Sequence, residues 1–163
     1  MTDDEYDEFY ATSAKRLVGQ LFAMTGDLAE SQDVVQEAFV RAWDRRRQLD
    51  NLDSPESWVR TVAWRIAVSR WRRNRAARRL RDLAPVRHLD PPGEDVVVLV
   101  SALRQIPEAQ RRALVLHHLC DLSVDEVAHE TKSPVGTVKA RLSRGRQALA
   151  RILSDVPTEV PHA

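Results

Sequence analysis

The residues of this sequence best suited to chemistry lie near its C-terminal end, on one face of a predicted helix that begins after Ser133. Small and polar side chains recur on this face with cations at its edges. The candidate contacts with duplex DNA are Ser133, Thr137, Lys139, Ala140, Arg141, Ser143 and Arg144. Small side chains let a helix approach the major groove closely, and Arg or Lys can donate to guanine O6 and N7. The pattern therefore predicts a helix that reads duplex DNA.

A short helix and a tight turn are predicted to position this face. Ser123 and Glu126 have capping-box spacing, in which the hydroxyl accepts from the Glu126 amide and the carboxylate from the Ser123 amide. Ser133 and Pro134 predict an N-cap followed by a first helical proline. The predicted buried positions are Val124, Val127 and Ala128 on the first helix and Val138, Leu142, Leu149 and Ile152 on the second. We therefore predict a helix-turn-helix; the alternative is a solvated basic face on an ordinary bundle helix.

A second set of candidates lies on a predicted helix that begins at Ser54-Pro55 and continues through Arg73 or beyond. Its core stripe is predicted to be Val59, Val62, Ala63 and Ile66, with Arg60, Trp64, Ala67 and Trp71 on the face away from Val62 and Ile66. Unpaired bases stack on aromatic rings at about 1–3 kcal/mol each, while guanidinium groups hold the backbone. The candidate contacts with a strand-separated nucleic acid are Arg60, Trp64, Arg65, Arg72 and Arg73.

The same tryptophans have a second interpretation, in which they pack against a neighbouring helix and the arginines are simply solvated. For Trp71 this interpretation is at least as well supported as base stacking, and Trp58 is assigned to the core. The Trp64 ring is therefore the main aromatic candidate for stacking on a base.

Basic residues are concentrated in two segments of a nearly neutral chain. The 163 residues carry a formal net charge of +1, but residues 57–81 hold 9 arginines and no acidic residue. Residues 1–56 hold 13 acidic and 6 basic residues, and a smaller basic cluster covers 139–151. Two separated basic elements predict two distinct contacts with a polyanion rather than general adhesion to it.

Composition and motifs exclude several classes of protein. The chain is 43% apolar and 30% charged, which indicates a globular protein, and its longest apolar run, Val96–Val100, is too short to span a membrane. Acidic residues between positions 3 and 8 occupy the place of the positive segment of a secretory leader. The single cysteine, Cys120, excludes an intrachain disulfide. We expect a cytoplasmic protein without membrane contact.

His117, His118 and Cys120 form a cluster of residue types that bind metals. Adjacent histidines point about 100° apart on a helix, and the sequence holds no second ligand cluster. It also has no Gly-rich phosphate loop, no HExxH and no GxSxG motif. We therefore expect no metal, no cofactor and no catalytic residue.

Three prolines and a glycine between Leu83 and Asp95 interrupt the helical periodicity and predict a linker. The predicted fold class is all-α, with two small helical domains joined by a flexible linker and a helix-turn-helix in the second. The predicted ranges are 1–81, a linker at 82–95, and 96–163. In the first domain, helices are expected over Glu5–Met24, about Ala29–Arg47, and from Ser54.

The second domain is predicted to begin with a helix, although the VVVLV run at 96–100 has strand propensity. The spacings of Leu99, Leu103 and Ile106 continue a helical pattern. Pro107 closes this helix, and another is predicted over Glu108–His118. In the first domain, the second helix is predicted to bury Val35, Ala38, Phe39 and Ala42.

Three segments in this order resemble the extracytoplasmic-function sigma factors of bacterial RNA polymerase. PVGTVKARLSRGRQAL resembles their recognition helix, DVVQEAFVRAW their DLVQExFLRAW helix, and SPESWVRTVAWRIAVSRWRRNRAAR their promoter-melting segment. The three segments span most of the chain. In two places the sequence departs from the family pattern: Trp64-Arg65 stands where Arg-Asn is frequent, and Ser69 where Asp is frequent.

The resemblance implies a promoter-specificity subunit that binds promoter DNA and core RNA polymerase. On the polymerase, the expected contacts are the β′ clamp helices and the β flap. The matching polymerase-docking positions are Asp33, Gln36, Glu37 and Arg41. Residues 57–75 would open the minus-ten element, and the Leu49–Ser54 loop, with Asn51, would receive a flipped base. The helix from Pro134 would read the minus-thirty-five duplex. An anti-sigma factor is a possible further partner.

Two other functions fit parts of the sequence. A conventional helix-turn-helix repressor or activator would bind an operator as a dimer, with half-sites one helical turn apart. That function does not account for the helix rich in Trp and Arg. An anti-activator or scaffold that binds only protein would lack salt-dependent affinity for DNA.

Overall fold

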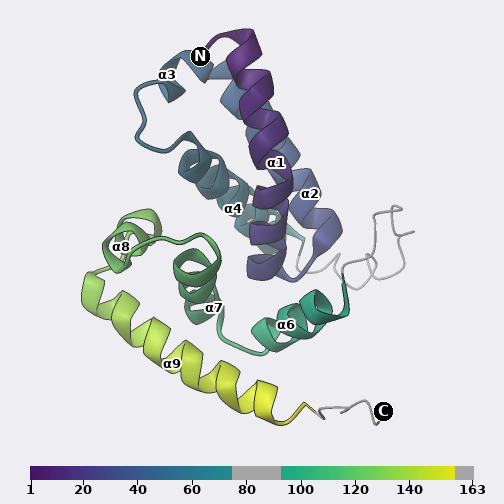
Figure 1. Cartoon of the computed structure of the whole chain (residues 1–163), viewed down its shortest axis with the longest axis vertical. Coiled ribbons are helices and arrows are strands. Elements are labelled where there is room, and N and C mark those ends of the chain that lie inside the picture. Colours follow the sequence, from purple (N-terminus) through teal and green to yellow (C-terminus); the bar gives the residue numbers. More distant parts are fainter. Residues whose placement is uncertain (75–92, 157–163) are drawn as a thin grey trace, which may run out of the picture. The chain divides into compact units, whose positions relative to one another are not determined.

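The structure is a computed structural model that describes residues 1–74 and 93–156, and within these ranges it contains helices and no strand (Figure 1). The chain divides into two compact units, Met1–Pro92 and Gly93–Ala163. The predicted all-α class with two small helical domains is therefore confirmed. Most of the linker predicted at 82–95 lies outside the described residues.

Helix α1 (Asp3–Thr25) begins earlier than the predicted Glu5 because Thr2 caps it. The Glu5 amide donates to Thr2 Oγ1 over 3.2 Å, and the Thr2 amide donates to Glu5 Oε2 over 2.6 Å, which completes a capping box. The helix ends at Gly26, whose φ of 74° is the left-handed conformation that favours glycine.

Helix α2 (Leu28–Asp44) buries the four predicted positions, none of which is more than 2% exposed: Val35, Ala38, Phe39 and Ala42. Its predicted end at Arg47 is wrong, because the helix stops at Asp44 and a short helix α3 (Arg46–Leu49) follows. The Arg46 guanidinium lies 4.0 Å from the centre of the Trp43 ring and donates to the Trp43 carbonyl over 3.1 Å. This turn brings Leu49, which is 1% exposed, into the core.

An aromatic cluster joins α1 to α2. The Tyr6 ring meets the Trp43 ring edge-on with centroids 4.9 Å apart, and its hydroxyl donates to the Phe39 carbonyl over 2.5 Å. Burial raises the pKa of Tyr6 to about 12. The phenol therefore stays protonated, and keeps donating to α2, even at an alkaline pH at which an exposed tyrosine would begin to ionise.

Helix α4 (Pro55–Arg73) starts at the predicted N-cap, where Ser54 Oγ accepts from the Ser57 amide over 3.1 Å. It packs against both α1 and α2, so its buried arc is wider than one stripe (Figure 1). Val59, Ala63 and Ile66 are buried as predicted, whereas Val62 and Trp58 are only half-buried.

The prediction of an outward face on α4 is wrong for three of its four residues. Arg60 is 3% exposed, Trp64 9% and Ala67 7%; only Trp71 is exposed, at 36%. The helical spacing placed these residues opposite a single core stripe, which assumes one neighbouring helix. In the structure α4 packs against two helices, so both sides of it are buried.

The second unit contains α6 (Glu94–Arg104), α7 (Glu108–Leu114), a π-helical turn η1 (Val115–Leu119), α8 (Val124–Thr131) and α9 (Val135–Ser154). The VVVLV run is helical, as predicted. The helix predicted over 108–118 forms as α7 continued by η1. Val100, Leu103 and Ile106 are buried in this unit.

Helices α8 and α9 form the predicted helix-turn-helix. The Ser123 capping box is present, with the Glu126 amide 3.1 Å from Ser123 Oγ. Lys132 ends α8 in the left-handed conformation, with φ of 51°. The predicted Ser133 N-cap is wrong, because Pro134 in extended conformation precedes the first helical residue. The Ser133 hydroxyl instead donates to the Thr131 carbonyl over 3.3 Å.

Helix α9 packs closely on α7 at Gly145, which is buried. A Cβ at this position would lie 2.9 Å from Leu114 Cδ1 and 3.1 Å from Leu114 Cγ. No heavy atom lies within 4 Å of a Cβ at Gly136, on the same helix. Gly145 therefore permits α9 to pack closely on Leu114, and a side chain at this position would have to displace the Leu114 side chain.

We expect Gly145→Val to lower the free energy of unfolding by about 1–3 kcal/mol, because the added methyl groups overpack the contact with Leu114. Gly136→Val is the matched control, and it should be neutral or slightly stabilising because valine is the better helix former. Urea unfolding followed by circular dichroism measures both changes. Equal effects of the two substitutions would show that the α7–α9 crossing tolerates a side chain.

Candidate protein and nucleic-acid interfaces

The outer face of α2 carries the four candidate docking residues around an exposed valine. Gln36 and Arg41 are exposed and Asp33 and Glu37 are half-buried. Val40, between them on the same face, is 59% exposed. A large exposed apolar side chain surrounded by charges is a suitable centre for a protein interface. The face was predicted from the sequence, and the structure leaves it open on this unit.

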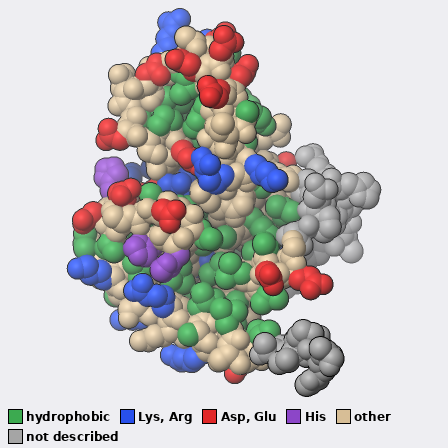
Figure 2. All heavy atoms as spheres, in the orientation of Figure 1, with side chains coloured by type: hydrophobic (Ala, Val, Ile, Leu, Met, Phe, Trp, Pro, Cys, Tyr) green, Lys and Arg blue, Asp and Glu red, His purple; other side chains and the backbone are tan. Residues whose placement is uncertain are grey.

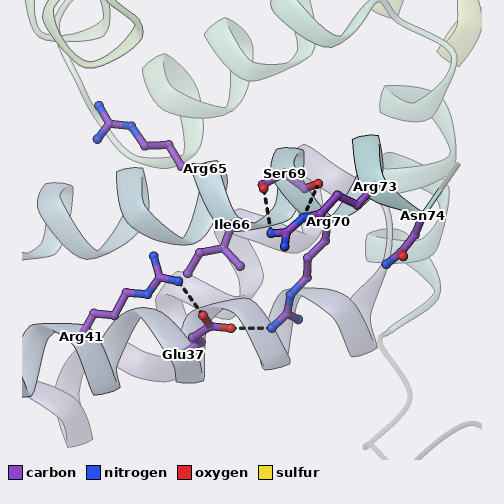
Figure 3. A pocket seen from close by; sticks show the side chains of 8 residues that line it. All are labelled: Glu37, Arg41, Arg65, Ile66, Ser69, Arg70, Arg73 and Asn74. Carbon is purple, nitrogen blue, oxygen red and sulfur yellow. Dashed lines mark hydrogen bonds and ion pairs between the residues drawn. The ribbon is translucent and has the colours of Figure 1, made fainter.

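Glu37 also fastens α2 to α4. Its carboxylate accepts from Arg41 Nη2 over 2.7 Å and from Arg70 Nη2 over 2.5 Å, as Figure 3 shows. Arg70 Nη1 lies 3.6 Å from Glu30 Oε1 as well. Sequence reasoning missed Arg70, although the spacing of Ala63, Ile66 and Arg70 places it on the side of α4 that meets α2.

We expect Glu37→Lys to lower the free energy of unfolding by about 1 kcal/mol, because it replaces a half-exposed interhelical ion pair with a cluster of like charges. Glu37→Gln should have a smaller effect. Urea unfolding in about 0.05 M and about 1 M salt tests this, since screening should reduce the difference from the wild type. A loss of stability that is the same in both salts would contradict an electrostatic origin.

An open hollow of about 630 Å³ lies where α2 meets the second half of α4 (Figure 3). It brings together two candidates for polymerase docking, Glu37 and Arg41, and two for the melted strand, Arg65 and Arg73. Its remaining lining residues are Ile66, Ser69, Arg70 and Asn74. Four guanidinium groups and one carboxylate make the hollow cationic, so it suits a phosphate or a carboxylate.

The candidates for a melted strand divide into exposed and buried residues. Arg65, Arg72 and Arg73 are exposed along α4, and Asn51 is exposed on the loop before it. Arg60 lies inside the unit, where it donates to Gln20 Oε1 over 3.2 Å. Of the two candidate rings on α4, that of Trp71 is the more exposed, at 36%, whereas Trp64, favoured from the sequence, is 9% exposed.

The candidates for duplex DNA differ in exposure according to which side of α9 they occupy. Lys139, Ser143 and Arg144 are exposed, opposite Val138 and Leu142, which are 0% and 2% exposed. The remaining candidates are half-buried: Ser133, Thr137, Ala140 and Arg141.

Arg141 is the candidate that the structure ties to the turn. Its Nη1 donates to the Ser133 hydroxyl over 2.9 Å, so it holds the turn to the second helix. Arg144, by contrast, is exposed.

The two histidines of the histidine and cysteine cluster lie on η1, and Cys120 follows its last residue; His118 is exposed and the other two are half-buried. His117 Nδ1 is 2.7 Å from the Leu122 carbonyl oxygen, and Cys120 caps the turn. Burial, and then the neighbouring His117 and Arg146 charges, lower the pKa of His118. Among the described residues, no three His, Cys, Asp or Glu side chains gather as metal ligands would.

Charge is unevenly distributed over the first unit. Figure 2 shows acidic side chains gathered around the N-terminal end of α1, where Asp3, Asp4, Glu5, Asp7 and Glu8 are all exposed. The exposed arginines of α4, Arg65, Arg72 and Arg73, come much later in the sequence of this unit. Within the described ranges, no helix has both the length and the apolarity that crossing a membrane requires.

Comparison with known proteins gives the family. Residues 9–77 match the model of Sigma-70 region 2, and residues 97–149 match that of Sigma-70, region 4. The ECF RNA polymerase sigma factor SigW of Bacillus subtilis is 30% identical over 152 residues, covering 83% of this chain and 81% of that protein. This chain belongs to the extracytoplasmic-function sigma factors. The RNA polymerase sigma-H factor of Pseudomonas aeruginosa is 27% identical to this sigma factor over 165 residues, covering 88% and 83% of the two chains.

Solved structures of two sigma-factor complexes share the fold of this sigma factor. The sigma factor RpoE from Bartonella quintana, in complex with the anti-sigma factor NepR, superposes with a TM-score of 0.76 at 19% identity, over 94% of this chain and 99% of the other. CnrH, in complex with the cytosolic domain of CnrY, gives 0.68 at 22% identity, over 96% and 92%.

Proposed function

We propose that this sigma factor binds core RNA polymerase through the outer face of α2 and directs it to promoters. The exposed end of α4 and the 50–54 loop would open the minus-ten element, and α9 would read the minus-thirty-five duplex. The supporting observation is that two units, matching regions 2 and 4, each present their own exposed cationic helix. The protein would act in the cytoplasm and catalyse no reaction itself.

The docking face is proposed to bind the β′ clamp helices through Asp33, Gln36 and Arg41 around Val40, while Glu37 contributes mainly by holding α2 to α4. The second unit would contact the β flap. An anti-sigma factor is a proposed further partner, in line with the complex of RpoE with NepR. The family matches favour this function over a dimeric operator-binding regulator.

On the promoter, the proposed roles follow exposure. Lys139, Ser143 and Arg144 would face base edges, and Arg141 would contact phosphate beside the turn. On α4, Arg65 and the pair Arg72 and Arg73 would hold the backbone of the melted strand. Base stacking would fall to Trp71 rather than to Trp64.

We expect the double substitution Arg72→Ala and Arg73→Ala to reduce open-complex formation by about threefold to tenfold, since two phosphate contacts are lost. A template with a pre-opened bubble should leave most of this defect in place, because the phosphates are present in either template. Permanganate footprinting of unpaired thymines with the holoenzyme measures it.

The matched control removes two exposed cations elsewhere, with Lys15→Ala and Arg104→Ala. It should leave the footprint unchanged. If both double variants lose the same reactivity, the effect is one of net charge, and the melting role of α4 is wrong.

A further inference from the structure

A chain of hydrogen bonds links α1 to the start of α4. Arg60 Nη1 donates to Gln20 Oε1 over 3.2 Å, and Arg60 Nη2 donates to Ser57 Oγ over 2.9 Å. Ser54 Oγ lies 3.1 Å from Ser57 Oγ. Ser54 is both the N-cap of α4 and the last residue of the exposed 50–54 loop. The chain of bonds therefore runs from the interior of the unit to the end of this loop.

The inner half of this chain is buried. Arg60 is 3% exposed and Gln20 is 7% exposed. A guanidinium group withdrawn from water is costly unless its donors find acceptors. Gln20 supplies one such acceptor from another helix and Ser57 supplies one from the first turn of α4. These two acceptors, one on α1 and one on α4, help to hold the Arg60 guanidinium in its orientation.

The outer half of the chain determines how the loop ends. Ser57 Oγ accepts from Arg60, which fixes the position of this oxygen. The Ser54 hydroxyl accepts from the Ser57 amide and also contacts Ser57 Oγ. The position of Ser57 Oγ therefore determines where the Ser54 hydroxyl can make both contacts at once. At the other end of the loop, Leu49 is 1% exposed and its carbonyl accepts from the Leu52 amide over 3.1 Å. The loop is thus held at both ends, at one end by core packing and at the other by Ser54.

A second contact between the same two helices serves as a natural comparison. Arg16 donates two hydrogen bonds to Glu56, over 2.7 and 3.0 Å, with the same offset of 40 residues as the Gln20 and Arg60 pair. The Arg16 side chain is 55% exposed. This ion pair fastens α1 to the first turn of α4 but is no part of the chain that reaches Ser54.

We propose that Gln20, Arg60 and Ser57 are positioning residues that orient the 50–54 loop to accept a base flipped out of the melted minus-ten strand. The inference rests on the proposed function, in which this loop receives the base. Flipping a base is unfavourable unless a preformed pocket compensates for the lost pairing and stacking. Arg60 acts through Ser57 and Ser54 rather than by touching DNA.

The test measures binding of the holoenzyme to the labelled non-template strand of a promoter that the wild-type protein opens. A series of strands carries an abasic site at each minus-ten position in turn. The wild type should bind one of these abasic strands about tenfold more weakly than the intact strand. The abasic site in that strand marks the position where a base is captured. This ratio reports capture of the base, whereas affinity for the abasic strand reports the remaining contacts.

Gln20→Leu keeps the size of the side chain and removes the acceptor. It should lower the preference for the intact strand by about fivefold while changing affinity for the abasic strand less than about twofold. Gln20→Glu keeps an acceptor for Arg60 and should restore the preference. Arg16→Gln, the matched control, breaks the neighbouring contact and should leave the preference unchanged.

Ser57→Ala provides a second test, because Gln20→Leu changes a buried residue and could fail to fold. It removes the middle oxygen of the chain, leaves the Ser54 N-cap bond to the Ser57 amide in place, and should lower the preference as Gln20→Leu does; Ser57→Thr should retain it. Circular dichroism verifies that each variant is folded.

The outcomes separate this inference from the proposed function. If the wild type binds every abasic strand as well as the intact one, the loop receives no base and the proposed function of the loop fails. If the wild type discriminates and Gln20→Leu and Ser57→Ala discriminate equally well, the positioning role is wrong. Equal losses of affinity for intact and abasic strands would also overturn it, because they indicate general destabilisation.

Discussion

Val40→Glu is expected to weaken association with core RNA polymerase by about tenfold or more, because it places a charge at the centre of the proposed docking face. Val40 is 59% exposed, so the fold should lose little when it is replaced. Surface substitutions away from special features usually change stability by less than about 0.5 kcal/mol. Fluorescence anisotropy of labelled protein titrated with core enzyme measures the affinity, and urea unfolding measures the stability.

The control for this substitution is Ala11→Glu, which adds the same charge to an exposed position of α1. It should bind core enzyme as the wild type does. Val40 is a better probe than Glu37, because Glu37→Lys also breaks the ion pair with Arg70. Wild-type affinity in the Val40 variant would show that polymerase docks elsewhere.

Arg144→Ala is expected to weaken binding to a specific duplex by about 1–3 kcal/mol, which is a loss of roughly fivefold to 150-fold. Its exposed guanidinium can form a bidentate contact with one guanine, so specificity should relax at a single base pair. Competition binding with a set of single-base variants of the minus-thirty-five duplex locates that base pair.

Arg141→Ala should behave differently, because Arg141 is half-buried and donates to the Ser133 hydroxyl. We expect it to weaken all duplexes about equally and to reduce the slope of log affinity against log salt by about 1. A loss confined to one base pair in the Arg141 variant would mean that α9 is rotated in the groove relative to this assignment.

The parts of the fold that could be predicted are those fixed by chemistry between near neighbours in the sequence. Ser123 with Glu126, and Ser54 with Pro55, place helix starts correctly because each cap is complete within one turn. The turn after α8 was located, but its cap was not. The Ser133 hydroxyl does not cap α9, because it donates to the Thr131 carbonyl and accepts from Arg141 instead.

The parts that could not be predicted depend on contacts between distant residues. The break at Arg45 follows from burying Leu49 and from the stacking of Arg46 on Trp43, and neither is a helix-stop signal. The face of α4 expected to point outward is largely buried because α4 packs against both α1 and α2, with Arg60 bonded to Gln20 of α1. A helical wheel gives the direction of a residue but not the number of neighbouring helices.

The candidate site shows the same division. On α9 and on α2, amphipathic spacing located the outer face, since each face is defined within its own helix, although several candidate residues on these faces are half-buried rather than exposed. The pairing of Glu37 with Arg70 joins residues 33 positions apart in sequence. The same limit applied to Arg60, whose acceptor Gln20 lies 40 positions away.

Run-off transcription with purified core RNA polymerase, with and without this protein, tests the central claim most directly. Addition of the protein should produce transcripts from a defined set of promoters, with permanganate-reactive thymines in the minus-ten region of each. No transcripts, and duplex DNA that stays closed at every site where the protein binds, would contradict the account and favour a dimeric operator-binding regulator.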